Sequence, residues 1–170
     1  TIYLFTVEKQ MLVNTSSGIQ QTKLKKLLKK LQGYDEIIID NNPSINLCTT
    51  NALCACERLI IPADLEKGAL KGIELTLQHS QEILENIDGA NFEIRILPTK
   101  IQRNKIDTET LEELKMAYGS MVYQTNIRYQ AAPIKDSSMK GRMLINDMKS
   151  RSKVAQDYRD LVAEVLQEEK

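Results

Sequence analysis

One run of three β-branched residues, Ile37–Ile39, limits the folds open to this chain more than any other feature. The run does not alternate with polar residues, and it ends at Asp40 and the turn-forming stretch 41–44. A strand without alternation is typical of parallel sheets, in which helices cover both faces. The run therefore predicts a strand that is buried on both faces and whose carboxyl end lies at an acidic turn.

The rest of the chain alternates between helix-like and strand-like segments. Apolar residues at helical spacing predict helices, and short β-rich runs predict strands. The alternation predicts an α/β fold with a mostly parallel, doubly wound sheet flanked by helices. A chain of 170 residues without a linker or a repeat predicts one domain over 1–170. The expected strands are 2–7, 37–39, 59–62, 92–97 and 121–123, and the expected helices are 20–32, 46–56, 66–87, one from Asp107 and one capped by Ser152.

Composition excludes several classes of function. Basic and acidic residues balance at 23 each, so only a local cluster of basic residues can favour nucleic acid. Three Cys residues do not suit a disulfide framework. They indicate a reducing, cytoplasmic compartment, and we expect them to be small buried residues. The single His, His79, excludes a His-rich metal site. No apolar run is long enough to span a bilayer, so we expect no membrane partner.

Asp40 is the strongest single candidate for a functional residue. In doubly wound folds, ligands bind beside the carboxyl ends of the strands. A carboxylate at such a position can hold Mg²⁺, directly or through water, next to the phosphates of a nucleotide. The alternative is a structural Asp that caps the turn or the next helix.

An ordered set of motifs resembles the ParA/MinD family of partition ATPases. Residues 34–44, YDEIIIDNNPS, are similar to the family's Walker B and switch region, Y-D-x-I-I-I-D-x-P-P-S. The later motifs keep the family's order, and the resemblance extends from Leu24 to Val165. They are Thr50–Leu53 for T-x-N-A-L, Leu59–Pro62 for the next strand, Glu66–Ile73 for E-x-x-A-L-x-G-L, Leu97–Thr99 for L-x-T, Tyr123–Arg128 for V-F-x-T-x-I-R, and Ser150–Tyr158 with Leu161–Val165 for the closing motifs.

The resemblance implies a P-loop NTPase-like fold that works with ATP and Mg²⁺. Asp40 would be the carboxylate of the metal site, and Pro98, Thr99 and Arg128 would lie at the nucleotide. It also implies an ATP-dependent homodimer that binds DNA without sequence preference, and a ParB-type centromere-binding partner. Such a protein serves plasmid or chromosome segregation, in the cytoplasm at the nucleoid.

Basic residues outnumber acidic ones after position 128, and the resemblance makes this stretch a candidate DNA-binding surface. Its contacts would be to phosphates, so binding would weaken as salt rises. The alternative is a basic face that is only solvated. The helix expected at 20–32 also has two interpretations. Its leucines would be buried, and its lysines would face either water, as on a plain surface helix, or an anionic membrane. The candidate DNA-binding residues are Arg103, Arg128, Lys140, Arg142, Lys149, Arg151 and Lys153.

Two departures from the family pattern limit the expected activity. The 170 residues contain neither a glycine-rich phosphate loop nor a D-x-D-P switch, and Asn42 replaces the first Pro of the family's P-P pair. Phosphoryl transfer depends mostly on positioning and electrostatics, so we expect no ATP hydrolysis by this chain alone. Turnover that is lost on Asp40→Ala would contradict this expectation. We therefore expect the C-terminal portion of a ParA-like ATPase. The alternatives are a non-catalytic interaction module with the ParA fold and a MinD-like membrane-associated regulator.

Overall fold

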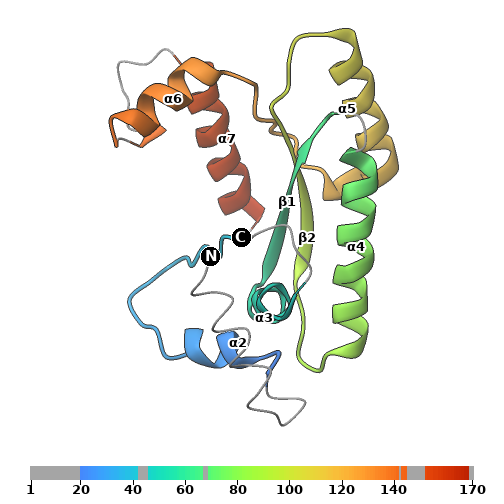
Figure 1. Ribbon diagram of the computed structural model, residues 1–170, viewed down its shortest axis with the longest axis vertical. Helices are drawn as coiled ribbons and strands as arrows, with labels where there is room; N and C mark the ends of the chain where they lie inside the picture. Colours follow the sequence, from blue (N-terminus) through green and yellow to red (C-terminus); the bar gives the residue numbers. More distant parts are fainter. Residues whose placement is uncertain (1–19, 42–45, 67–68, 142, 145–151, 169–170) are drawn as a thin grey trace. The chain divides into compact units, whose positions relative to one another are not determined.

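The computed structural model describes residues 20–41, 46–66, 69–141, 143–144 and 152–168. The strand expected at 2–7 and the candidate DNA-binding residues Arg142, Lys149 and Arg151 lie outside these ranges. In chain order (Figure 1), the elements are α2 (Lys23–Leu28), α3 (Leu47–Ala55), β1 (Arg58–Asp64), α4 (Ala69–Asn86), β2 (Glu93–Thr99), α5 (Lys105–Tyr118), the 3₁₀ turn η1 (Gly119–Met121), α6 (Ala131–Met139) and α7 (Lys153–Glu168).

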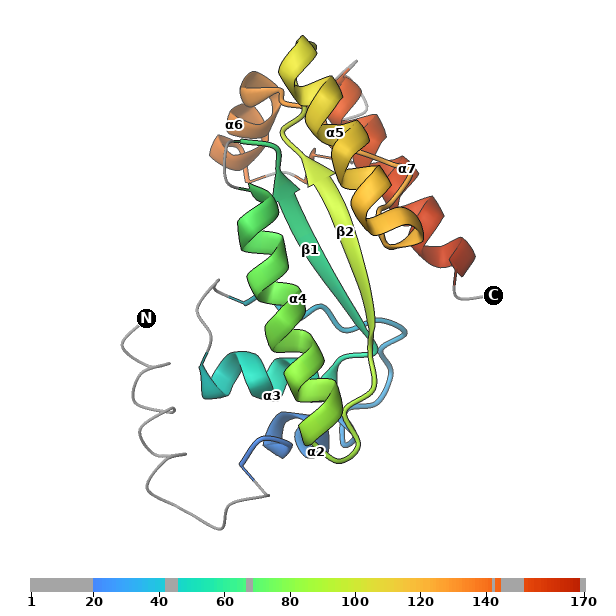
Figure 2. The ribbon, with the colours of Figure 1, turned by 90° about the vertical axis from the view of Figure 1, so that its right-hand side faces the viewer.

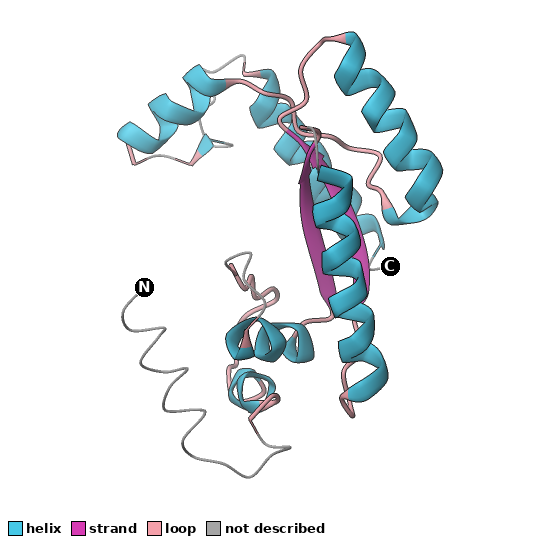
Figure 3. Cartoon of the chain, turned by 45° about the vertical axis from the view of Figure 1, so that its right-hand side comes forward, coloured by secondary structure: helices cyan, strands magenta, loops and turns pink. Residues whose placement is uncertain are grey.

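The predicted α/β class is confirmed. Strands β1 and β2 are hydrogen-bonded neighbours that run in the same direction, and α4 connects them (Figure 2). Figure 3 shows the two paired strands in magenta and the helices in cyan. The segments expected at 46–56, 59–62, 66–87 and 92–97 correspond to α3, β1, α4 and β2 with small shifts at their ends. A β-α-β unit of this kind is the basic element of a parallel sheet.

Contacts divide the chain into two compact units, each with its own buried side chains. The first contains residues up to 59 together with 75–93, and the second contains 60–74 together with 94 onward. The core of the first includes Ala52, Leu53, Cys54, Ile83 and Phe92. The core of the second is formed by Leu97, Tyr123, Ile127 and Val154, with Leu144, Leu161 and Val165 packed against them.

The segment 122–129 lies beside β2 as an irregular third strand. The N–H groups of Tyr123 and Ile127 donate to carbonyl oxygens of β2, each at 2.9 Å. Parallel bridges join Val122 to Ile96 of β2 and Arg128 to Ile101, two residues beyond the end of β2. This arrangement extends the parallel sheet within the second unit and places Arg128 near the carboxyl end of β2.

The strand expected at 121–123 begins later than predicted. Residues 119–121 form η1, which begins at Gly119, the residue that ends α5 with φ 51° and ψ −122°. A residue with a Cβ rarely adopts this conformation, so a glycine is required to turn the chain at this point. The backbone becomes extended only at Val122.

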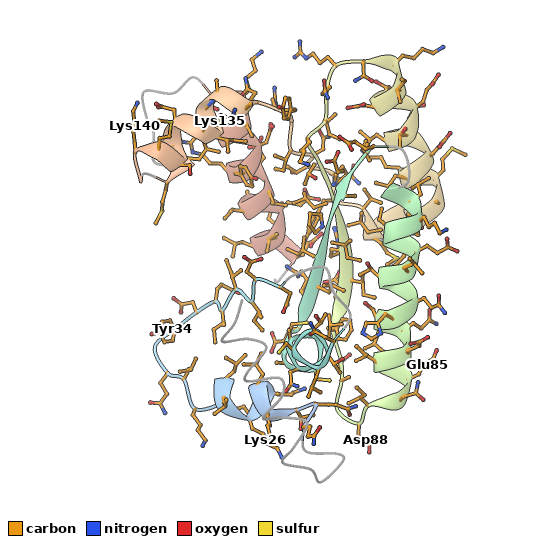
Figure 4. The ribbon with its side chains drawn as sticks, viewed as in Figure 1. Lys26, Tyr34, Glu85, Asp88, Lys135 and Lys140 are labelled. Carbon is orange, nitrogen blue, oxygen red and sulfur yellow. The ribbon has the colours of Figure 1, made fainter. Side chains whose placement is uncertain are left out.

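The strand expected at 37–39 is not formed. Residues 36–41 have no regular secondary structure, and the Ile38 side chain is 93% exposed. Tyr34 projects from the same loop (Figure 4). A strand needs a neighbouring backbone for its hydrogen bonds, and within the described ranges no strand pairs with this segment. The three isoleucines indicate that the segment prefers burial, but they do not determine whether an adjacent strand is present to pair with it.

The helix expected at 20–32 is also shorter than predicted. Beyond α2, the N–H groups of Lys30 and Leu31 donate to carbonyls three residues back, which is the tighter 3₁₀ pattern. Leu27 and Leu31 were expected to be buried, but they are 58% and 51% exposed. The prediction of one continuous buried leucine stripe is therefore wrong for these two positions.

Side-chain caps set the starts of α5 and α7. The Asn104 side chain accepts a hydrogen bond from the Asp107 N–H at 2.8 Å, so α5 begins two residues before the predicted start. The Ser152 hydroxyl accepts one from the Ala155 N–H at 3.4 Å. The predicted cap of the last helix is thereby confirmed.

Candidate site at the carboxyl ends of the strands

In the second unit, the carboxyl ends of β1 and β2 carry opposite charges. Asp64 ends β1, Lys100 follows β2, and Lys100 Nζ donates to Asp64 Oδ2 at 2.5 Å. This hydrogen bond raises the pKa of Lys100. Among the described residues other than glycine, only Lys100 has a positive φ, at 55°. Backbone strain of this kind concentrates at functional sites, and sequence reasoning did not identify Lys100 because its partner is 36 residues away.

The predicted nucleotide residues Pro98 and Thr99 lie at the end of β2. Pro98 is fully buried, and its carbonyl accepts a hydrogen bond from the Ile127 N–H at 2.9 Å. Thr99 is half-buried at the last position of the strand. Pro98 therefore helps to fix the edge of the sheet, and Thr99 is the member of the pair whose side chain is open to solvent.

Arg128 is held by Asp157 of α7. Its backbone N–H donates to Asp157 Oδ2 at 3.0 Å, its Nε to the same oxygen at 2.7 Å, and its Nη2 to Oδ1 at 2.6 Å. This bidentate geometry is the strongest form of an arginine–carboxylate contact, and the hydrogen bonds to Asp157 raise the pKa of Arg128. The Asp157 side chain is 5% exposed and that of Arg128 is 38% exposed.

A second carboxylate of α7 fixes the segment just before Arg128. The N–H groups of Gln124 and Thr125 donate to the two oxygens of Glu164, each at 2.8 Å. Burial raises the pKa of Glu164, but hydrogen bonds from Thr125 and Gln124 outweigh it, so the net shift is downward. Together, Asp157 and Glu164 accept backbone N–H groups of 124–128 that do not face β2.

A third carboxylate of α7 reaches β2 itself. Glu168 forms an ion pair with Arg95, whose guanidinium lies 4.4 Å from the centre of the Tyr123 ring. A cation over an aromatic face adds an attraction beyond apolar contact. The side chains of α7 thus hold both β2 and the strand-like segment beside it.

The Glu164 contacts predict an acid-dependent loss of stability. The folded-state pKa of Glu164 lies below its unfolded value, so its stabilisation is complete above the unfolded pKa and is lost as pH falls through the folded one. We expect the advantage of the natural chain over Glu164→Gln in free energy of unfolding to shrink below pH 4.5, the ordinary value for this group. Urea titrations between pH 6.5 and about 3 measure it. The exposed Glu112→Gln should show no such trend, and a pH-independent Glu164→Gln difference would contradict the assignment.

The described residues do not complete a site for ATP and Mg²⁺. Asp40 is exposed in the irregular segment 36–41 and offers one carboxylate. Within the part of the chain that the structure describes, no three His, Cys, Asp or Glu residues form a metal-binding group. Mg²⁺ can be held by one carboxylate together with substrate phosphates, but the sequence contains no glycine-rich backbone cradle for those phosphates. We therefore derive no hydrolytic step, and the metal role of Asp40 stays a prediction.

The candidate DNA-binding residues that are described lie in the second unit. Arg103 is exposed in the loop after β2, and Lys153 is exposed at the first position of α7. Lys140, labelled with Lys135 in Figure 4, forms an ion pair with Asp136 at 2.7 Å. Exposed pairs of this kind contribute little, so Lys140 remains available to a phosphate. Arg103, Lys140 and Lys153 thus lie in three separate segments of the second unit.

The three cysteines lie in the first unit, and none of them forms a disulfide. Cys54 is buried, and Cys48 and Cys56 are half-buried. Burial, assisted by the neighbouring Cys54, raises the pKa of Cys56 to about 11. A thiol with this pKa is a poor nucleophile near neutral pH. The expectation of small buried residues holds for Cys54, whereas Cys48 and Cys56 are only half-buried.

Comparison with known proteins decides the family. A family model described as an AAA domain matches residues 1–96, which is more than half of the chain. The chain is also 32% identical over 152 residues to the sporulation initiation inhibitor protein Soj of Bacillus subtilis. The chain belongs to the ParA/MinD family.

Solved structures of similar fold agree with this assignment. A plasmid partition protein of Borrelia burgdorferi, bound to AMPPNP, superposes with a TM-score of 0.72 over 91% of this ParA/MinD chain at 21% identity. A cobyrinic acid a,c-diamide synthase of Mycobacterium smegmatis, with an ATP analogue and magnesium, superposes with a TM-score of 0.79 at 24% identity. At these identities the two structures show a shared P-loop NTPase-like fold.

The chain spans only part of each of these proteins. It covers 58% of Soj, 59% of the partition protein and 62% of the synthase. Of the helices that the structure describes, none has the combined length and apolar character needed to cross a bilayer.

Proposed function

We propose that this chain is part of a ParA-type partition protein that serves the segregation of plasmid or chromosomal DNA. Family membership over an ordered set of motifs is the observation that carries the proposal. The fold neighbour described as a plasmid partition protein supports the same role. The synthase neighbour indicates that the fold also serves other chemistry, so fold alone does not carry the argument.

The proposed mechanism is that of an ATP-dependent homodimer that binds DNA without sequence preference and responds to a ParB-type partner. Mg-ATP would be held with Asp40 at the metal and with Pro98, Thr99 and Arg128 near the nucleotide. Bound Mg-ATP would supply the free energy that couples dimerisation to DNA binding. In this chain, Thr99 lies beside the strained Lys100 and its partner Asp64, at the edge of the sheet where ligands of such folds bind.

DNA binding is the part of the proposal that this chain can test directly. We expect duplex DNA to bind through phosphate contacts of Arg103, Lys140 and Lys153 and of the other basic residues at 142–151. The variant Lys149→Glu/Arg151→Glu/Lys153→Glu should weaken binding more than tenfold and lower the slope of log affinity against log salt by about 2.7, at about 0.9 per contact. Fluorescence anisotropy with a labelled duplex at several salt concentrations measures both quantities.

A matched charge reversal elsewhere in the chain distinguishes DNA binding by this particular surface from a general effect of net charge. Lys26, Lys29 and Lys30 are exposed, and reversing them changes the net charge by the same amount on a different basic stretch. We expect this second variant to keep the natural salt slope. An unchanged affinity in the first variant, or an equal loss in both, would sink the proposed surface.

A further inference from the structure

Arg128, a candidate phosphate ligand, already has an anionic ligand inside the molecule. Its Nε and Nη2 both donate to Asp157, at 2.7 and 2.6 Å, and its backbone N–H donates to the same carboxylate at 3.0 Å. The two residues are 29 positions apart, so the contact is made by the fold and not by a local turn.

The two partners differ in their access to solvent. The Asp157 side chain is 5% exposed, whereas that of Arg128 is 38% exposed. A buried carboxylate that lost its arginine would have no water to replace it, so separation of the pair is strongly disfavoured. Arg128 is therefore accessible from outside, while its Nε/Nη2 edge is occupied and its charge is balanced from inside.

A carboxylate and a phosphate compete for the same feature of an arginine. Both accept two parallel N–H bonds from the planar guanidinium. We propose that Asp157 occupies the Nε/Nη2 edge of Arg128 and balances its charge, and that this masking keeps Arg128 from acting as a phosphate ligand for DNA. This inference rests on the proposed DNA binding and concerns its regulation.

The masking has a consequence for the DNA surface. The affinity of the chain is set by basic residues such as Arg103 and Lys153, which lie exposed at the surface. Under this proposal the charge of Arg128 adds nothing to DNA affinity. Its role is structural, because its pairing with Asp157 holds the backbone of this segment beside the end of β2. A change that removed the carboxylate of Asp157 would add one phosphate ligand to the surface.

The variant Asp157→Asn tests this proposal. Asparagine keeps the size of the side chain and an oxygen that can accept from the Arg128 N–H, but it removes the charge. We expect affinity for duplex DNA to rise about fivefold, and the salt slope to steepen by about 0.9, as for one added phosphate contact.

Asp160→Asn is the matched control. Asp160 lies one turn further along α7, acts on Arg128 only through its charge, and has its own hydrogen-bond partner in Gln156. It removes the same charge without releasing the arginine, so its effect on affinity should stay below twofold. Equal effects of the two variants would overturn the masking while leaving DNA binding intact. If neither variant nor the natural chain binds duplex DNA, the DNA surface proposed for these residues fails together with the masking, whereas binding that does not respond to Asp157→Asn overturns the masking alone.

A measurement on the natural chain avoids any effect of the variant on folding. The Arg128 Nε–H signal, observed by NMR, should be protected from exchange and should not shift when saturating duplex DNA is added. In Asp157→Asn the same signal should shift with DNA. A shift in the natural chain would mean that a phosphate displaces Asp157, and it would overturn the proposal.

Discussion

Replacing Arg128 with Met lowers the free energy of unfolding by about 3 kcal/mol, because it leaves the carboxylate of Asp157 buried without its cation. The converse change, Asp157→Asn, costs less, about 1 kcal/mol, because the half-exposed guanidinium of Arg128 can turn to water. The difference follows from the exposures of the two side chains, 38% for Arg128 and 5% for Asp157.

Urea unfolding followed by circular dichroism measures these losses, and Arg103→Met serves as the control. Arg103 is exposed in a loop, so its replacement should change stability by less than about 0.5 kcal/mol. If Asp157→Asn proves as costly as Arg128→Met, the burial of the carboxylate is not what makes the pair important.

Replacing Tyr123 with Ala lowers the free energy of unfolding by about 4 kcal/mol, as expected for an aromatic residue removed from a core. Tyr123 is 0% exposed and belongs to the core cluster with Leu97 and Val154. The change also removes the ring on which Arg95 stacks at 4.4 Å, a contact that contributes about 0.5–1 kcal/mol or more when desolvated.

Tyr129→Ala is the matched comparison, since this tyrosine is six residues further along the chain and 53% exposed. We expect it to change stability by less than about 0.5 kcal/mol. Chemical denaturation measures both losses, with one common slope of the free energy of unfolding against denaturant concentration for all variants. Similar losses for the two tyrosines would mean that the cluster around Tyr123 does not form the core of the second unit.

Much of the fold is predictable from the sequence because its signals are local. The strands β1 and β2 are short runs bounded by breakers, and α4 has regular apolar spacing. Each of these patterns can be recognised within about 20 residues. The caps of α5 and α7 are equally local, since each involves a side chain and a backbone group three residues apart.

The failed prediction at 37–39 has the opposite cause. The three isoleucines report that the segment prefers burial, but strand formation depends on a neighbour that local sequence does not specify. Within the described residues this neighbour is not found, and Ile38 is exposed. Leu27 in the short helix α2 and Leu31 just beyond it were misjudged in a similar way, because their burial depends on packing partners that local spacing does not specify.

The candidate site was predicted only in part. The family motifs drew attention to Thr99 and Arg128, which the structure places at or near the carboxyl end of β2, and their roles stay a prediction. Their partners were missed, because the Arg128–Asp157 pair spans 29 residues and the Lys100–Asp64 pair spans 36. A single sequence carries no signal for such contacts, and the positive φ of Lys100 is visible only in the folded chain.

The hydrogen bonds from the strand-like segment 122–129 to carboxylates of α7 can form only after α7 has been synthesised. Gln124 donates its N–H to Glu164, which the ribosome adds 40 residues later. At roughly 5–20 residues per second, translation leaves this sheet edge without its helix for roughly 2–8 seconds. During that interval the N–H groups of Gln124, Thr125 and Arg128 are open to strands of other nascent chains. The completion of the second unit is therefore controlled by the arrival of its last helix, and the emerging chain needs protection most while residues 125 to 164 are being made.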